Sequence, residues 1–146
     1  MHVQYAVPRI GLPAATSIRR WASAALEQSA EATVRLVDGR EGRTLNRSYR
    51  GRDYATNVLT FTYGLQDGAL TGDIVLCAPV VAREAAKQRK PLRLHYAHLV
   101  VHGMLHLQGY DHEQASDARR MEAKEITILA QLGFDNPYED GYRPRA

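Results

Sequence analysis

The segment HGMLHLQGYDH, residues 102–112, constrains the fold more than any other part of the chain. His102 and His106 are four residues apart, so on a helix they lie one turn apart on the same face. Gly109 is a typical stop for such a helix, and the turn after it lets His112 return over that face. Two histidines from a helix and a third from the next loop can fill three corners of a tetrahedron and leave the fourth open, as in catalytic zinc sites. The segment therefore predicts three metal ligands: His102, His106 and His112.

The residue after the first histidine narrows the chemistry of this site. In helical zinc proteases with the pattern His-Glu-x-x-His, the glutamate is the general base. Here that position is Gly103, so a peptidase or a similar ester hydrolase would lack its base. Imidazole ligands favour zinc, although nickel and iron also accept them. We expect one Zn²⁺ ion, used differently from the metal of those proteases.

Composition limits the class of protein. A chain of 146 residues with 45% hydrophobic and 24% charged residues is typical of one globular domain, and we expect residues 1–146 to form it. Residues 1–110 hold 14 Lys and Arg against 8 Asp and Glu, whereas residues 111–146 hold 5 against 8. This basic body suggests a polyanionic partner. One cysteine, no long apolar run and no export signal at the start predict a cytoplasmic protein without a membrane partner.

The hydrophobic pattern predicts an α+β fold, with a mixed sheet of about four strands and about five helices. The expected strands are residues 1–7, 33–37, 58–63 and 73–76. We expect a first helix that starts at Thr16 or a neighbour, and further helices over 41–49, 78–90 and 91–108. A last helix should be capped by Ser116 or Asp117 and stopped at Gly133. We expect a loop at 64–72. The helix that carries the histidines is rich in apolar residues, so it should be central and buried.

Other side chains have more than one interpretation. Arg43, Arg47 and Arg50 share one face of the helix over 41–49, where a guanidinium can grip a phosphate or be merely solvated. Asp111 either orients a ligand histidine or caps the turn. His98 fits a residue behind the ligands or in the core, and His95 a surface residue. A second basic face, on 78–90, is a weaker candidate for contact with a polyanion.

Several motifs together resemble the YbeY family of bacterial rRNA maturation factors. They are HGMLHLQGYDH at 102–112, LNRSYRGRDYATNVLTF at 45–61, GDI at 72–74 and a last helix with Met121, Glu125, Leu129 and Gly133, although no role is assigned to these four. The resemblance spans most of the chain and implies a mixed sheet covered by helices. It places the family's zinc ligands on His102, His106 and His112 and its functional arginine on Arg50. We take Arg50 and His102 as the catalytic residues.

The resemblance also implies an activity and partners. It implies a zinc-dependent endoribonuclease that prefers single strands and acts in maturation of small-subunit ribosomal RNA, notably its 3′ end, and in ribosome quality control. The partners would be ribosomal RNA and the small ribosomal subunit, with ribosomal proteins or assembly factors as further candidates. Water and the RNA 2′-OH both remain open as the nucleophile. The alternative is a non-catalytic ribosome-assembly factor whose metal only fastens the turn after Gly109.

Overall fold

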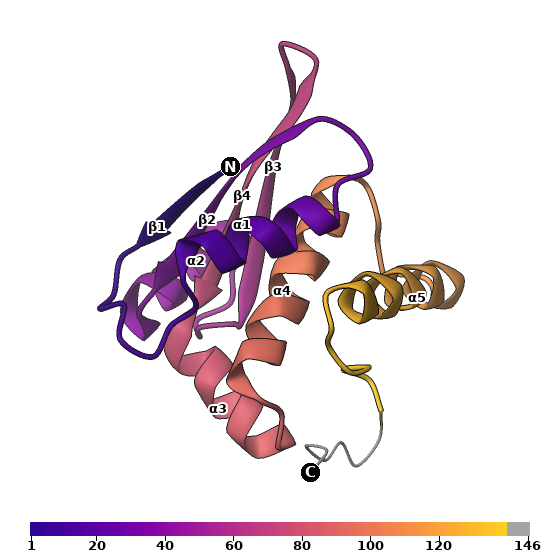
Figure 1. Ribbon diagram of the computed structural model, residues 1–146. Helices are drawn as coiled ribbons and strands as arrows, with labels where there is room; N and C mark the ends of the chain where they lie inside the picture. The colour runs from indigo at the N-terminus through magenta and orange to yellow at the C-terminus, as the bar shows by residue number, and fades with distance from the viewer. Residues whose placement is uncertain (140–146) are drawn as a thin grey trace.

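The computed structural model describes residues 1–139 and shows the predicted α+β architecture around one four-stranded sheet (Figure 1). Along the chain the elements are β1 (His2–Tyr5), α1 (Ala15–Ala24), β2 (Ala30–Val37), α2 (Gly39–Arg50), β3 (Val58–Gln66), β4 (Ala69–Cys77), α3 (Ala78–Gln88), α4 (Leu92–Leu107) and α5 (Ala115–Gln131). Residues 140–146, which end the predicted domain and the acidic tail, lie outside the described residues.

The sheet is mixed, as predicted. Its strand order is β1-β2-β4-β3, in which β2 pairs in parallel with both β1 and β4. Only β3 runs antiparallel, at one edge beside β4. The parallel step from β2 to β4 takes in α2 and β3, so the chain leaves the sheet and returns to it before β4 is added.

The predicted loop at 64–72 is wrong, because most of it is strand. β3 and β4 continue as a long hairpin that projects beyond the helices (Figure 1). Asp67 and Gly68 form its two-residue turn with φ values of 51° and 82°, as in the type I′ turns that match the twist of paired strands. The exposed hairpin has weak hydrophobic alternation and several glycines, and this composition imitates a loop in the sequence.

Strand β4 is covered on both faces, which explains its continuous apolar sequence. Ile74 and Leu76 face a large core shared with α1, α4 and α5, whereas Val75 and Cys77 face a smaller core on the side of α2. Cys77 is a buried free thiol, and its burial raises its pKa.

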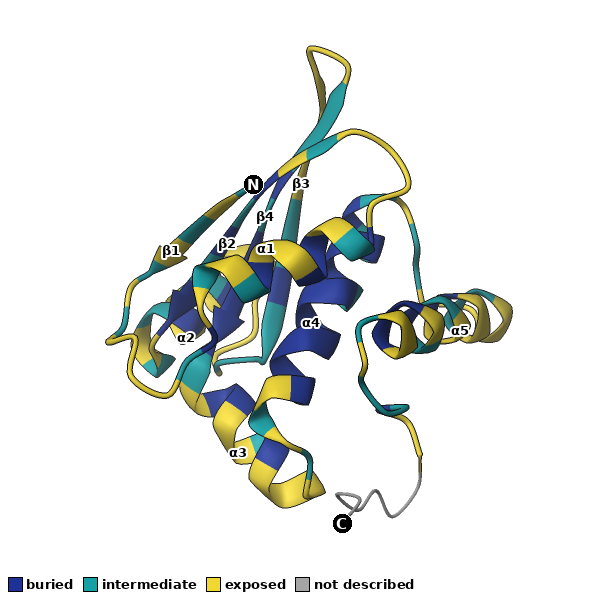
Figure 2. Cartoon of the chain, in the orientation of Figure 1, coloured by how far each residue is buried: buried dark blue, intermediate teal, exposed yellow. Residues whose placement is uncertain are grey.

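Helix α4 is the central, buried helix that the sequence predicts. It lies between the sheet and α5, and nearly its whole length is buried (Figure 2). Its apolar residues contact α1, α3 and α5 as well as the sheet. Neither α4 nor any other helix within residues 1–139 is both long enough and apolar enough to cross a membrane. Because α4 is buried along most of its length, its histidines lie on a rigid part of the fold.

Of the two predicted helix starts, one is confirmed and one is wrong. Helix α1 begins at Ala15, next to the predicted Thr16, whereas α5 has Gln114 as its N-cap rather than Ser116 or Asp117. Neither of these N-caps has a side-chain hydrogen bond. Packing of the apolar faces, rather than a capping side chain, therefore decides where these helices begin.

Candidate active site

A groove of about 700 Å³ lies between α2, β3 and the end of α4. Arg50 lines it from the last turn of α2, and residues 56–63 form its wall. His102 and His106 line it from α4, and His112 lines it from the loop before α5. The structure thus brings all four predicted site residues to one groove, although about fifty positions separate Arg50 from the histidines in the sequence.

The three histidine rings form a cluster at one end of this groove. The ring centroids of His102 and His106 are 6.4 Å apart, and those of His112 lie 5.6 Å and 6.1 Å from them. Within residues 1–139 no group of three or more histidine, cysteine or acidic side chains is placed so that it could hold a metal ion as it stands. His112 belongs to an exposed loop, so of the three rings it has the most freedom to approach the other two.

The end of α4 fixes which nitrogen of His106 is free. Gly109 adopts a positive φ of 101°, and the amide of Tyr110 returns to the carbonyl of Leu105 at 3.0 Å, which closes the helix as the sequence predicts. This turn places the Tyr110 carbonyl 2.9 Å from Nδ1 of His106. A carbonyl only accepts, so Nδ1 carries the proton and Nε2 is left with a lone pair.

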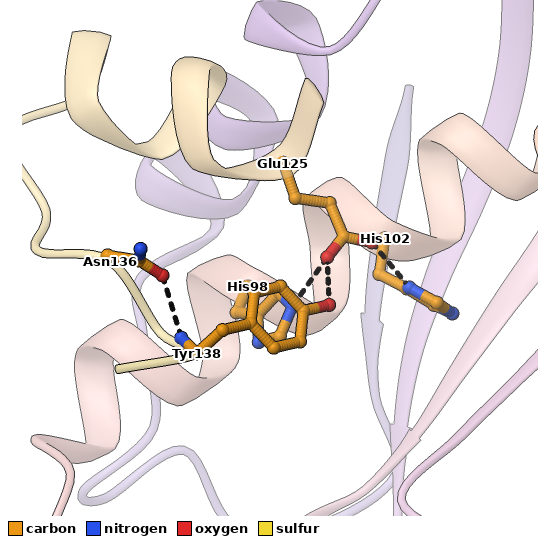
Figure 3. A network of polar contacts seen from close by, with 5 residues as sticks. All are labelled: His98, His102, Glu125, Asn136 and Tyr138. Carbon is orange, nitrogen blue, oxygen red and sulfur yellow. Dashed lines mark hydrogen bonds and ion pairs between the residues drawn. The ribbon is translucent and has the colours of Figure 1, made fainter. Parts of the chain in front are cut away.

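His102 is oriented by a buried carboxylate from α5. Its Nδ1 lies 2.7 Å from Oε2 of Glu125, whose side chain is fully buried (Figure 3). Oε1 of the same carboxylate lies 2.8 Å from Nε2 of His98 and also accepts from the hydroxyl of Tyr138. Burial by itself raises the pKa of Glu125, but the hydrogen bonds from His102 and His98 outweigh it and lower the pKa to about 2. Glu125 is therefore ionised and acts only as an acceptor.

Glu125 is the residue that sequence reasoning missed. It lies in the apolar stripe of α5 with Met121, Ile128 and Leu129, all of which are buried. A carboxylate within such a stripe is a signal in itself, because an acidic side chain is almost never fully buried without partners. The sequence did not reveal that its partners would be histidines of α4.

The motif's glutamine has a structural role. The amide oxygen of Gln108 accepts from the backbone N–H of Glu27 at 2.7 Å, and its amide nitrogen donates to the carbonyl of Ala25 at 2.8 Å. These bonds fasten the end of α4 to the connection between α1 and β2. The turn that carries His112 thus starts from an anchored point.

Arg50 differs from its neighbours on α2 in having no acidic partner within residues 1–139. Arg43 forms a bidentate ion pair with Asp53. The same carboxylate lies 3.9 Å from Arg47. Gly51 then ends the helix with a φ of 69°, so Arg50 is the last helical residue and is exposed at the groove. Of the three arginines predicted on this face, only Arg50 combines an uncommitted guanidinium with a place in the groove.

Three further sequence interpretations are resolved by hydrogen bonds. Asp111 accepts from the amide of Glu113 at 2.6 Å, so it caps the turn. His98 lies in the core behind His102, as expected. The surface position predicted for His95 is wrong, because this side chain is only 4% exposed and pairs with Glu84 at 2.9 Å. The packing of α3 against α4 buries the His95 side chain.

Aromatic side chains form the groove wall opposite the histidines. Tyr49 and Tyr63 line it and are 68% and 57% exposed, and Tyr49 packs edge-on against Phe61 with 4.7 Å between ring centroids. A bulge in β3 makes Tyr63 an extra residue between the pairs Thr62–Gly72 and Gly64–Thr71. Its hydroxyl donates to Asp73 at 2.8 Å, and this raises the pKa of Tyr63 to about 12. Such bulges commonly redirect a side chain near a functional site.

Comparison with known proteins identifies relatives over most of the chain. A family model described as "Endoribonuclease YbeY" matches residues 14–133. Proteins of that name from Cupriavidus pinatubonensis, Aromatoleum aromaticum and Stenotrophomonas maltophilia are 58%, 64% and 55% identical to it. The matches cover 94%, 86% and 93% of this chain and 69%, 81% and 91% of the relatives.

A solved structure supports the fold independently. The solution structure of TM1509 from Thermotoga maritima superposes with a TM-score of 0.54 over 94% of this chain and 98% of that one, at 20% identity. At this identity the match concerns the fold alone. The family model and the close relatives go further, and with them the chain belongs to the YbeY family of endoribonucleases.

Proposed function

We propose that this chain is a zinc-dependent endoribonuclease that cleaves single-stranded RNA at the groove. Its substrate would be precursor RNA of the small ribosomal subunit, cut near the 3′ end in the cytoplasm, with a further role in ribosome quality control. The relatives carry the name endoribonuclease. The observation that carries the proposal is that Arg50 shares one groove with His102, His106 and His112.

The donor set of the three histidines fits a zinc ion. Nδ1 of His102 and of His106 is engaged by Glu125 and by the Tyr110 carbonyl, which leaves Nε2 of each as the available ligand atom. Neutral imidazoles leave the full charge of a divalent ion uncompensated, which suits an anionic substrate. When bound there, zinc supplies Lewis-acid chemistry that polarises a phosphodiester and acidifies the attacking oxygen. His112 completes the set from its loop.

Arg50 is the residue of this chain that binds the scissile phosphate in this proposal. A guanidinium stays charged and holds two phosphate oxygens at once through parallel N–H donors. Its charge also offsets the negative charge that builds up on the phosphate as the attacking oxygen approaches. Because Arg50 ends α2 directly before Gly51, the side chain can approach the substrate without breaking an ion pair.

The groove wall accounts for a preference for unpaired RNA. Bases that are free of a partner strand can stack on exposed aromatic rings, and Tyr49 and Tyr63 present such rings beside Arg50. Paired bases keep their faces stacked inside the duplex and cannot use these rings. A single strand therefore gains contacts in the groove that a duplex does not.

The test is an RNA-cleavage assay combined with measurement of bound zinc. His102→Ala should lose both zinc and cleavage, whereas Arg50→Glu should lose cleavage and keep zinc. His2→Ala and Arg52→Glu are matched controls, since His2 lies on β1 and Arg52 lies outside the groove lining. Undiminished cleavage by a zinc-free variant would contradict the proposal.

The same assay separates the alternative role. A non-catalytic assembly factor with a structural metal would still bind its RNA or ribosomal partner with His102→Ala present, provided that the variant folds. It would also show no cleavage by the unchanged chain with zinc supplied. Cleavage that a chelator abolishes and zinc restores would favour the enzyme.

A further inference from the structure

Three hydrogen-bond donors converge on the carboxylate of Glu125. Oε2 lies 2.7 Å from Nδ1 of His102, and Oε1 lies 2.8 Å from Nε2 of His98 and accepts from the Tyr138 hydroxyl. Figure 3 shows these side chains arriving from α4, α5 and the segment after α5. The hydroxyl of Tyr138 is also 3.0 Å from Nε2 of His98. A fully buried carboxylate is costly unless it is satisfied in this way.

The positions of the protons follow from this arrangement. The buried carboxyl group accepts from all three polar neighbours only when each imidazole nitrogen that faces it carries a proton. Nδ1 of His98 is buried and has no hydrogen-bond partner among residues 1–139. This nitrogen has no acceptor for a proton within the described part of the chain, so the hydrogen bond to Glu125 holds the proton of His98 on Nε2. His102 faces the same carboxyl group through Nδ1, so its proton lies there.

The tautomer of His102 with its proton on Nδ1 is not the one that a free histidine side chain favours. A neutral histidine side chain in water favours the proton on Nε2, which would block the nitrogen that metals bind at the groove. The partner of the other nitrogen decides which tautomer a histidine adopts. In metal proteins a carboxylate in this position also fixes the direction of the ring and raises its basicity.

We propose that Glu125 is a positioning residue, which holds His102 with an unprotonated Nε2 toward the groove and is itself held by His98 and Tyr138. The inference rests on the proposed function in that it gives the metal site its preformed ligand. Glu125 touches neither the groove nor the RNA, and it acts only through His102. The segment after α5 thereby takes part in the active site through one hydroxyl group.

The chain contains a matched pair without this role. His95 of α4 is also buried and contacts a glutamate of another helix, since its Nε2 lies 2.9 Å from Oε1 of Glu84. His95 does not line the groove. If Glu125 only fastened α5 to α4, Glu125→Gln and Glu84→Gln should have similar consequences for the three site histidines. A positioning role predicts that they differ.

The first experiment needs no variant. In metal-free protein at about pH 8, where ordinary imidazoles are neutral, ¹⁵N NMR distinguishes the protonated from the bare nitrogen of each histidine ring. We expect His102 to carry its proton on Nδ1. A proton on Nε2 of His102 would overturn the proposal. This result is independent of whether zinc is the physiological metal.

The second experiment measures zinc affinity by competition with a chromophoric chelator. An amide at 125 offers one acceptor oxygen for two imidazoles and a phenol, so Glu125→Gln should raise the Kd for zinc by roughly 10- to 100-fold. Glu84→Gln should leave it unchanged. Equal affinities in the Glu125→Gln variant and the unchanged chain, or equal losses in both variants, would contradict positioning. If the Glu125→Gln variant does not fold, the proposal is tested by the tautomer of His102 in the unchanged chain.

The two proposals fail in different ways. If the unchanged chain does not bind zinc, the proposed use of zinc is refuted. The NMR experiment on metal-free protein would still test whether Glu125 sets the tautomer of His102. Normal cleavage combined with Nε2-protonated His102 would refute positioning by Glu125 and leave the nuclease intact.

Discussion

Gly103 of α4 packs directly against Ile74 of β4. A Cβ atom built on Gly103 would lie 3.0 Å from two carbons of the Ile74 side chain and 3.1 Å from a third. The glycine that follows His102 is therefore required by the contact between the central helix and the central strand. A glutamate at this position, as in the helical zinc proteases, would point into β4 rather than toward the histidines. The lack of a protease-type base thus has a cause in the packing.

Replacing Gly103 with alanine should destabilise the fold. Alanine is favoured over glycine in a helix by about 1 kcal/mol, but an added methyl in a packed core costs roughly 1–3 kcal/mol. Ile74 is fully buried and β-branched, so it has little freedom to move away. The difference is a net loss of up to about 2 kcal/mol in the free energy of unfolding, measured by urea denaturation.

Gly39→Ala is the matched control for this experiment. Gly39 is the first residue of α2, and a Cβ there would lie an ordinary 3.7 Å from Pro79. This variant should be as stable as the unchanged chain or slightly more so. Equal stability of the Gly103→Ala variant would show that the helix and the strand can separate without cost.

His95 should make the fold sensitive to mild acid. Burial lowers the pKa of His95, and Glu84 offsets this only in part. Between the folded pKa and the unfolded value near 6.5, the unfolded chain binds more protons, so stability falls as the pH drops through this range. An NMR titration should give His95 a pKa below 6.5. In the Glu84→Gln variant the pKa should fall further, and an unchanged value would mean that Glu84 does not act on this ring.

Tyr49→Ala should weaken binding of single-stranded RNA. Loss of one stacking ring costs about 1–3 kcal/mol per base, and Tyr49 is the more exposed of the two tyrosines that line the groove. Fluorescence anisotropy with a short labelled RNA would measure the change in Kd. Tyr49→Phe should keep the affinity, because it keeps the ring. Tyr54→Ala is the control, since Tyr54 is 52% exposed but outside the groove lining.

Local sequence rules were sufficient where the chain itself sets the geometry. The period of the helix places His102 one turn from His106, and Gly109 ends α4 with the predicted turn. The apolar run at Ile74 predicted a central strand, and its two covered faces confirm this. The first two cases depend on contacts within a few residues, and the third depends on the composition of the strand itself.

Local rules failed where distant packing decides. Glu125 meets His102 across 23 positions because α5 lies against α4, and no pattern within α5 reveals that contact. His95 is buried for the same reason, since α3 covers its side of α4. Residues 64–72 imitate a loop because this end of the β3–β4 hairpin pairs with itself and not with the core. The tyrosine wall combines Tyr49 of α2 with Tyr63 at the bulge of β3, and no local pattern predicts that these two elements meet.

Zinc should stabilise the folded chain through the three histidines. A ligand that binds only the folded state adds about 2.7 kcal/mol when its concentration is a hundred times its Kd. We therefore expect zinc to raise the melting temperature of metal-free protein and a chelator to reverse the rise. His106→Ala should abolish the increase, because the ring fixed by the Tyr110 carbonyl would be gone, whereas His2→Ala should keep it. The same increase in both variants would mean that zinc binds elsewhere on the chain and that the histidine cluster has another role.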